Sequence, residues 1–317
     1  MNPAFFIVGC PRSGTTLLRR MVDAHPRLAV TRETHWIPEL YADVAGTTPL
    51  GFVTPELLAR LFRHEKFAHL GTTWGELERL APAGDDVTYA DLVSKLFDRY
   101  GQARSKSVVG DKTPGYAQDI PMLHELWPQA KFVHLIRDGR DVCLSAVSWR
   151  KADKLAARFP TWLEHPVTTA AFWWARYVEL GREGGALAGP RVYREIRYER
   201  VVSEAARTCA ELCAHLDVPY SDTMIRFHEG RTKTTPGLDA KHAWLPITAG
   251  IRDWKIGMRP DDVERFEAAA GDLLAELGYE RMFPRPALDT VRETSRLRDV
   301  FIGDCQERGQ PLPAAWL

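Results

Sequence analysis

The stretch FFIVGCPRSGTT at residues 5–16 constrains the fold of this chain more than any other part of its sequence. A short apolar run that ends in glycine is typical of a strand buried on both faces of a sheet. Gly9 and Gly14 are spaced as in the first half of the phosphate-binding motif GxxxxGKS/T. Apolar residues then recur at helical spacing from Leu17 to Val22. The stretch therefore predicts a buried strand, a phosphate-binding loop and a helix, in that order.

The loop departs from the motif at one position. Thr15 stands where the lysine belongs and Thr16 follows it, so the loop lacks the cation that kinases and NTPases place beside Mg²⁺ and the β- and γ-phosphates. Arg12 is the one cation inside the loop. Backbone N–H groups at a helix N-terminus form an anion pocket, and a guanidinium adds bidentate donors. We therefore expect one phosphate that carries a transferable anionic group; a P-loop kinase or NTPase is the alternative.

Further apolar strands and amphipathic helices alternate along the chain. The predicted strands cover residues 4–9, 107–110, 132–136 and 192–198. The predicted helices cover roughly 54–69, 86–103, 115–126, 166–183, 200–216 and 259–278. This alternation predicts an α/β fold: a P-loop-type parallel β-sheet flanked by helices on both faces, with helical insertions near 36–105 and 150–186.

No internal repeat or long Ser/Gly linker divides the chain. We predict a single domain over residues 1–281. Residues 282–317, which are rich in Arg and Pro, are expected to form a C-terminal extension that packs on the surface or on a partner.

The amino-acid composition limits the kinds of partner that this chain is expected to bind. Lys plus Arg (42) equals Asp plus Glu (42), so no overall field favours nucleic acid or an anionic membrane. The first apolar run starts close to Met1 without a basic leader and is too short for a signal peptide or a membrane span. Five cysteines form no CxxC pair, which favours reduced thiols. We expect a cytoplasmic protein with no membrane span and no nucleic-acid partner, and we leave a homodimer open.

Two segments together resemble a known family. PRSGTTLL at 11–18 and RDGRDVCLS at 137–145 look like the two signatures of the sulfotransferases that use 3′-phosphoadenosine 5′-phosphosulfate (PAPS). The resemblance implies PAPS as donor, 3′-phosphoadenosine 5′-phosphate (PAP) as product, and no metal. It assigns Arg137 and Ser145 to the 3′-phosphate. It also assigns five loop residues to the 5′-phosphosulfate: Arg12, Ser13, Gly14, Thr15 and Thr16.

Two weaker matches extend the nucleotide site. RYERVV at 197–202 resembles the family's Tyr-Glu strand end, which makes Tyr198 a candidate contact. IRDWK at 251–255 is similar to the Trp-containing segment that closes over the nucleotide, which implies Arg252 and Trp254. Arg140 and Asp141, by contrast, are expected to form surface ion pairs or helix caps.

Within the family, RETHWIP at 32–38 and GDKTP at 110–114 resemble the tyrosylprotein sulfotransferases and their bacterial relatives most. The resemblance implies that Glu33 is the catalytic carboxylate and that Lys112 acts on the transferring group. His35 stands where that group has arginine. We therefore expect a small hydroxyl-bearing acceptor, such as a phenol, alcohol or sugar, with a tyrosyl peptide as the alternative. A catalytically inactive nucleotide-binding protein is a further alternative.

In-line sulfuryl transfer needs positioned partners, stabilised charge and a base on the far side of the sulfur. Arg12 and Lys112 can stabilise charge on the phosphosulfate and on its bridging oxygen. Glu33 and His35 are the candidate bases, and residues two apart on an extended chain point to the same side. Chemistry alone leaves both open, because histidine side chains titrate near working pH. The resemblance favours Glu33.

Overall fold

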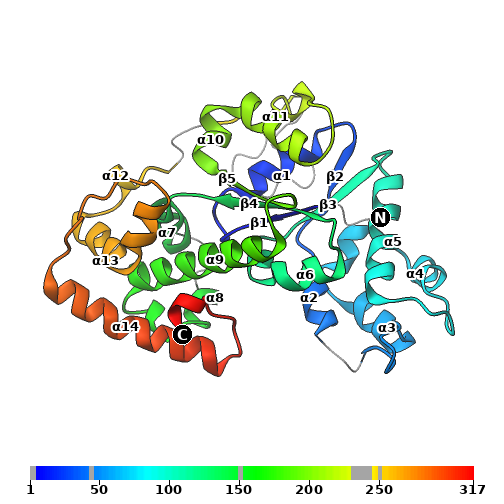
Figure 1. The fold of residues 1–317 in the computed structure, drawn as a ribbon, viewed down its shortest axis with the longest axis horizontal. Helices are drawn as coiled ribbons and strands as arrows, with labels where there is room; N and C mark the ends of the chain where they lie inside the picture. The colour runs from blue at the N-terminus through cyan, green and yellow to red at the C-terminus, as the bar shows by residue number, and fades with distance from the viewer. Residues whose placement is uncertain (1–4, 43–45, 149–152, 230–244, 249–251) are drawn as a thin grey trace.

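The structure is a computed structural model that describes residues 5–42, 46–148, 153–229, 245–248 and 252–317. Its centre is a five-stranded sheet with the order β2-β3-β1-β4-β5, in which every neighbouring pair is parallel (Figure 1). The strands are β1 (Phe5–Val8), β2 (Leu28–Val30), β3 (Val108–Lys112), β4 (Lys131–Ile136) and β5 (Tyr193–Arg197).

Helices lie in the connections between the strands and in the part of the chain after β5. The α-helices are α1 (Thr15–Asp23), α2 (Trp36–Tyr41), α3 (Pro55–Arg63), α4 (Trp74–Leu80), α5 (Tyr89–Gln102), α6 (Ile120–Leu126), α7 (Gly139–Val147), α8 (Asp153–Ala156), α9 (Pro166–Ala188), α10 (Tyr198–Ser203), α11 (Ala205–His215), α12 (Trp254–Gly257), α13 (Pro260–Glu276) and α14 (Leu288–Glu307). The insertion between β2 and β3 consists of α2 to α5, as the predicted range 36–105 implies.

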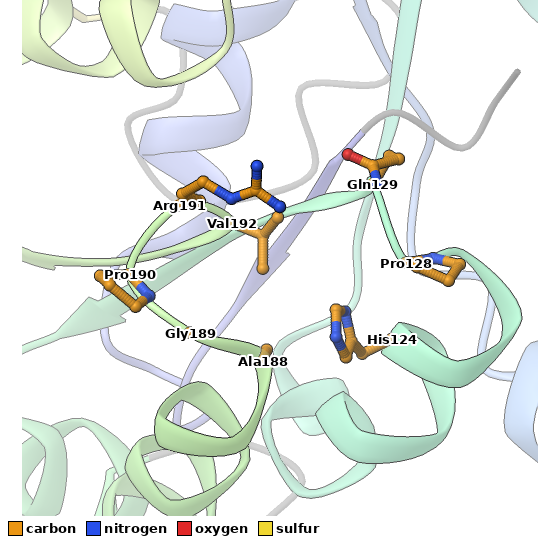
Figure 2. A pocket seen from close by; sticks show the side chains of 8 residues that line it. All are labelled: His124, Pro128, Gln129, Ala188, Gly189, Pro190, Arg191 and Val192. Atoms are coloured by element: carbon orange, nitrogen blue, oxygen red, sulfur yellow. The ribbon is translucent and has the colours of Figure 1, made fainter.

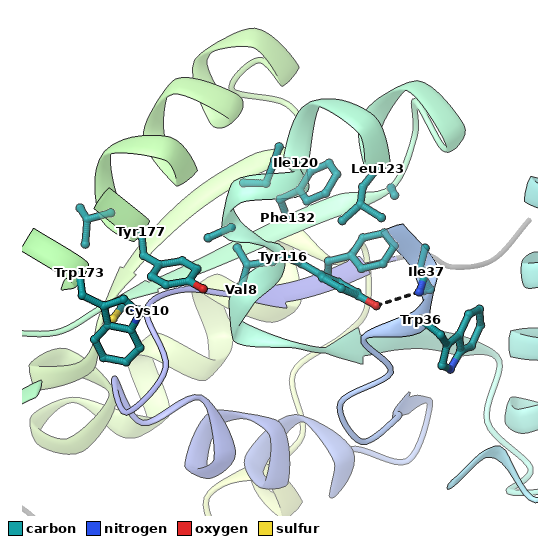
Figure 3. Packing of buried hydrophobic residues seen from close by; sticks show 14 of the residues in the cluster. Val8, Cys10, Trp36, Ile37, Tyr116, Ile120, Leu123, Phe132, Trp173 and Tyr177 are labelled. Atoms are coloured by element: carbon teal, nitrogen blue, oxygen red, sulfur yellow. Dashed lines mark hydrogen bonds between the residues drawn. The ribbon is translucent and has the colours of Figure 1, made fainter. Parts of the chain in front are cut away.

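The sheet separates two hydrophobic clusters, because successive side chains of a strand point to opposite faces. Phe5 and Ile7 pack with buried residues of α1 and α11. Phe6 and Val8 pack with α5, α6 and α9 on the opposite face, part of which is shown in Figure 3. Figure 1 shows α1, α10 and α11 on one side of the sheet and α6 and α9 on the other. The predicted fold class is therefore confirmed.

Several predicted boundaries are wrong. The sequence analysis missed β2, which has only three residues. The predicted helix 54–69 ends at Arg63, because His64 adopts an extended backbone (φ −66°, ψ 127°). The predicted strand 192–198 ends one residue early, so Tyr198 begins α10.

The predicted C-terminal extension contains the long helix α14. Phe301 of this helix is fully buried and stacks on Phe159 with ring centroids 4.7 Å apart. Residues after 281 therefore contribute to the main core, and the division at residue 281 stays a prediction. Within the described part of the chain, none of the helices combines the length and the apolarity needed to cross a membrane.

The parallel sheet explains where function can lie. All five strands end at the same edge, and in open α/β sheets ligands bind outside the carboxyl ends of the strands. The candidate residues follow these ends one strand at a time: Arg12 after β1, Glu33 after β2, Lys112 in β3, Arg137 after β4 and Tyr198 after β5.

Candidate active site

The loop between β1 and α1 requires glycine at two positions. Gly9 has a φ of 148°, and a Cβ there would lie 2.4 Å from the carbonyl oxygen of Leu135 in β4. Gly14 precedes α1 with a φ of 94°, and a Cβ there would lie 2.4 Å from the ring of Tyr198. Arg12 itself has a φ of 78°. The loop backbone thus packs directly on β4 and on Tyr198. Glycine permits this close approach because it has no Cβ.

Three guanidinium groups gather around this loop. Burial, followed by the nearby charges of Arg252 and Arg137, lowers the pKa of Arg12, while Glu33 acts in the opposite direction. Burial and then Arg137 also lower the pKa of Arg252. Like charges held this close favour an anion between them. A chain without net charge therefore concentrates positive charge at the predicted donor site.

The second predicted signature meets the first. Arg12 Nε donates to Ser145 Oγ across 3.0 Å, which joins the loop after β1 to helix α7. Arg137 lies with its guanidinium 4.3 Å from the centroid of the Tyr198 ring, a cation–π contact. The structure thus brings Arg12, Arg137, Ser145 and Tyr198 together, as the sequence analysis expects, and their roles stay predictions.

Two buried polar atoms fit a phosphate ligand. Ser13 Oγ and Arg137 Nε are buried and have no hydrogen-bond partner among the described residues. Nearly all buried polar groups in native proteins are hydrogen-bonded, so such atoms call for a partner. Phosphate oxygens are acceptors that suit both a hydroxyl and a guanidinium. The residues present therefore fit a nucleotide that carries phosphate at two positions.

Glu33 lies in the loop between β2 and α2, with a partner on each carboxylate oxygen. Lys112 Nζ donates to Glu33 Oε1 across 2.5 Å, and His35 Nε2 lies 3.2 Å from Glu33 Oε2. The Glu33 side chain is 41% exposed, whereas that of Lys112 is 6% exposed. A small molecule or peptide can therefore reach the carboxylate, while the ammonium is held inside.

The electrostatics keep Glu33 ionised. Burial alone would raise the pKa of the carboxyl, but the hydrogen bond with His35 and the charge and hydrogen bond of Lys112 outweigh it and lower the pKa to about 2. Burial lowers the pKa of Lys112, and Glu33 opposes this effect. The base candidate is thus a carboxylate across the physiological pH range.

The loop that carries Glu33 is fixed from behind. Thr34 N donates to Thr113 Oγ1 at 3.0 Å, and the Thr34 hydroxyl lies 2.7 Å from that of Tyr116. Figure 3 shows the Tyr116 hydroxyl accepting a hydrogen bond from the backbone N–H of Ile37. These contacts join the β2–α2 loop to the segment after β3. They place Glu33 and Lys112 side by side although the two residues are far apart in sequence.

Sequence reasoning missed a buried carboxyl beneath this loop. Asp111 is fully buried in β3, and its Oδ2 accepts a hydrogen bond from Thr31 Oγ1 at 2.7 Å. Burial raises the pKa of Asp111 to about 6, although the hydrogen bonds from Thr31 and Thr113 act against this. The signal available in the sequence was a charged residue directly before Lys112 in a strand.

Several basic side chains share one region with Glu33, which sequence reasoning also missed. Burial and then the charges of Arg32, Lys66 and Arg19 lower the pKa of His69, and Glu33 has the opposite effect. These side chains come from α1, the β2–α2 loop and the insertion. His69 therefore lies where the charges of three cationic side chains and of Glu33 all reach it.

The predicted closing segment lies on α7. Trp254 N donates to Asp141 Oδ1 at 2.9 Å, and Arg252 Nη1 donates to Ser148 Oγ at 3.1 Å. Ile251, the first residue of the predicted segment, lies outside the described residues. The structure thus places Arg252 and Trp254 beside the helix that carries Ser145.

The expectation of surface ion pairs for Arg140 and Asp141 is wrong. Arg140 is 1% exposed, pairs with Asp138 and Glu267, and lies 3.6 Å from the centroid of the Trp254 ring. Asp141 Oδ2 accepts from Arg137 Nη2 at 2.9 Å. The cap of α7 is instead Asp138, whose Oδ1 accepts a hydrogen bond from Arg140 N.

A cavity of about 260 Å³ is lined by none of these residues; its lining side chains are shown in Figure 2. Its lining includes His124 of α6, the helix that precedes β4, and Arg191, which lies just before β5. It therefore lies at the amino ends of the strands, opposite the candidate site. Across the described residues, no three His, Cys, Asp or Glu side chains are grouped so that they could hold a metal ion.

Comparison with known proteins agrees with this geometry. A family model described as "Sulfotransferase family" matches residues 3–222, which is more than half of the chain. Protein-tyrosine sulfotransferase 1 of Danio rerio is 26% identical over 88% of this chain and 72% of its own length. The protein of the same name from Homo sapiens is 27% identical over 88% of this chain and 70% of its own length.

Solved structures show the same fold. The sulfotransferase domain from the curacin biosynthetic pathway superimposes with a TM-score of 0.62 at 21% identity, and covers 89% of this chain and 99% of that one. The sulfotransferase domain of the Synechococcus PCC 7002 olefin synthase has a TM-score of 0.51 at 20% identity, over 98% of this chain and 96% of that one.

Proposed function

This chain belongs to the sulfotransferase family and is a PAPS-dependent sulfotransferase, and from this premise we propose that its acceptor is the phenolic hydroxyl of a tyrosyl residue in an acidic peptide. One observation carries the proposal: the charges of an accessible carboxylate, Glu33, and of three cationic side chains, Arg19, Arg32 and Lys66, all act on His69, so they lie in one region. Opposite charges around a site favour and orient an anionic partner. The curated relatives named protein-tyrosine sulfotransferases support the same acceptor.

PAPS supplies a sulfuryl group on a phosphate leaving group. The residues that would hold its 5′-phosphosulfate are Arg12, Ser13, Gly14, Thr15 and Thr16, with the N-terminus of α1 behind them. Arg137 and Ser145 would hold the 3′-phosphate, and Tyr198, Arg252 and Trp254 would line the nucleotide. Three guanidinium groups and two unpartnered buried polar atoms support this assignment.

The acceptor side has its own division of roles. Glu33 would accept the phenolic proton, since it is ionised and an acceptor molecule can reach it. Lys112 would stabilise negative charge on the leaving oxygen. His35, on the second carboxylate oxygen, would orient Glu33. We propose that no metal takes part, a proposal that unchanged turnover in EDTA would support.

A small phenol, alcohol or sugar is the second candidate acceptor. His35 favours it, because this histidine replaces the arginine that the tyrosylprotein sulfotransferases have after Glu-Thr. We keep the cytoplasm as the proposed location on the sequence arguments above, and fractionation of cells that express the untagged protein would test it.

The acceptor experiment compares three compounds with PAPS as donor. They are a tyrosyl peptide rich in Asp and Glu, the same peptide with Asn and Gln at the acidic positions, and a small uncharged phenol. PAP release and the mass of one added SO₃ group are measured. We expect the acidic peptide to be the best substrate by kcat/KM. A small phenol that exceeded both peptides would replace the proposed acceptor.

The donor assignment is tested separately. PAP should raise the melting temperature of the protein, since ligands that bind only the native state stabilise it. ATP with or without Mg²⁺ should raise it less. A larger effect of ATP with Mg²⁺ would favour the kinase alternative, and PAP binding without transfer to any acceptor would favour an inactive nucleotide-binding protein.

A further inference from the structure

The carboxylate of Asp141 divides its two oxygens between two parts of the donor site. Oδ2 accepts from Arg137 Nη2 at 2.9 Å, and Oδ1 accepts from the backbone N–H of Trp254 at 2.9 Å. The side chain of Asp141 is 14% exposed and that of Arg137 is 8% exposed. The bridge is therefore shielded from water, where a charge-assisted hydrogen bond is stronger and better defined.

The geometry of Arg137 leaves room for a second partner. Its Nη2 is used by Asp141 and its flat face lies over Tyr198, whereas its Nε is buried without a hydrogen-bond partner among the described residues. A guanidinium donates from a rigid planar fork. A carboxylate that holds one arm of the fork therefore sets the direction of the others.

The 252–258 segment contacts α7 at several points. Arg252 donates to Leu144 O and Ser148 Oγ, and the ring of Trp254 lies on the buried guanidinium of Arg140. Of the α7 side chains that hydrogen-bond this segment in the described part of the chain, Asp141 is the one that also binds Arg137. It thus joins the expected 3′-phosphate ligand to the expected closing segment.

We propose that Asp141 is a positioning residue that couples recognition of the 3′-phosphate by Arg137 to the docking of Trp254. A nucleotide with a 3′-phosphate then orders the 252–258 segment, and a nucleotide without one does so less. The inference rests on the proposed donor site. It also gives a reason for the burial of Arg140. The Arg140 guanidinium supports the ring of Trp254, while Asp141 binds the backbone N–H of the same residue.

The coupling is reciprocal by thermodynamic necessity. Fixing Arg137 with phosphate strengthens the hold of Asp141 on Trp254 N, and a docked Trp254 strengthens the affinity for the 3′-phosphate by the same factor. Asparagine at position 141 keeps an oxygen for the Trp254 amide but loses the charge that orients Arg137. We expect this substitution to weaken PAP binding about tenfold, within the usual range for coupled sites.

The test uses the full chain and two nucleotides, PAP and adenosine 5′-phosphate, which lacks the 3′-phosphate. Calorimetry measures the affinity of each for the wild type, Asp141→Asn, Asp141→Ala and the control Asp289→Asn. Asp289 is a good control because it is an exposed aspartate of α14 that pairs with Arg292 and lies outside the 252–258 segment. We expect Asp141→Asn to lower PAP affinity, to leave adenosine 5′-phosphate affinity unchanged, and the control to keep the wild-type ratio.

Hydrogen exchange gives a readout that a merely structural role would not produce. In the wild type, PAP should slow amide exchange of residues 252–258 more than adenosine 5′-phosphate does. In Asp141→Asn this difference should disappear. If Asp141→Ala fails to fold, the near-isosteric asparagine variant decides the question.

A wild-type ratio of the two affinities in Asp141→Asn would overturn the inference. An equal loss of affinity for both nucleotides would also overturn it, since that result indicates general damage to the site. Failure of the wild type to bind PAP would instead overturn the donor assignment itself.

Discussion

Lys112 and Glu33 form one ion pair, with the ammonium Nζ 2.5 Å from the carboxylate Oε1. The expected base and the expected stabiliser of the leaving oxygen thus contact each other directly. Glu33 lies in the loop after β2, and Lys112 ends the neighbouring strand β3, so their distance is set by β2–β3 pairing and by the Thr34–Thr113 hydrogen bond. Substitutions at either residue should therefore affect transfer far more than nucleotide binding.

Glu33→Gln should lower kcat by about 10²–10⁴-fold, the usual contribution of a general base. The amide cannot accept the acceptor's proton, but it leaves the arginine-rich donor site intact. PAP release measures turnover, and calorimetry should show nearly unchanged PAP affinity. Glu39→Gln is a control on the exposed surface of α2. Full turnover by the Glu33 variant would remove Glu33 as the base.

The pH profile separates Glu33 from His35. Because the pKa of Glu33 is depressed to about 2, its ionised form is fully present above roughly pH 4, and its contribution is lost only as the pH falls toward 2. If Glu33 is the base, its ionisation should cause no change in kcat/KM between about pH 5 and 8. A limb near neutral pH that disappears in His35→Asn would assign the base to the imidazole.

Gly14→Ala should damage the donor loop. The left-handed φ of 94° costs an alanine about 1–2 kcal/mol, and its Cβ would also meet the Tyr198 ring at 2.4 Å. Gly84 is a matched control, since it has a φ of 93° and open space around its Cβ position. Both variants should lose some thermal stability, but only Gly14→Ala should lose PAP affinity. Equal PAP binding by the two variants would contradict this account of the loop.

Asp111→Asn should stabilise the protein at alkaline pH. Burial raises the pKa of Asp111 from 3.8 to about 6, so the native state binds more protons than the unfolded state between these values. Stability should therefore fall as the pH rises through this window, by about 3 kcal/mol at 1.36 kcal/mol per pKa unit. The asparagine variant should lack this loss. Urea unfolding at pH 5 and pH 8 samples the upper half of this window and should show about 1.4 kcal/mol of the loss, with exposed Asp85→Asn as the control.

The sequence predicted the donor half of the site well, for a physical reason. A phosphate loop needs a buried strand, glycines with left-handed backbone and a following helix, and all three leave local patterns in the sequence. Arg137 and Ser145 follow the same logic on one strand and its helix. Even so, the length of β2 and the break at His64 were beyond local reasoning, because tertiary contacts decide both.

The acceptor half could be predicted only in part. Glu33 and Lys112 came from a resemblance, and the contact between them depends on strand pairing that local patterns do not encode. Arg140 looked like a surface residue because charged side chains are seldom fully buried. Its partner Glu267 is distant in the sequence, so no local sequence pattern predicts this ion pair. Arg19, Arg32 and Lys66, which act on His69 together with Glu33, likewise come from separate segments.

The sheet order distributes the two substrates over different lengths of chain. Most of the expected donor residues follow β1, β4 and β5, whereas Glu33 follows β2 and Lys112 ends β3, on either side of the insertion. The segment with helices α2 to α5 can therefore be replaced by the corresponding segment of another protein, while β1, β4 and β5 stay unchanged. A chimaera that carries this segment from another member of the family should keep its nucleotide and acquire a different acceptor.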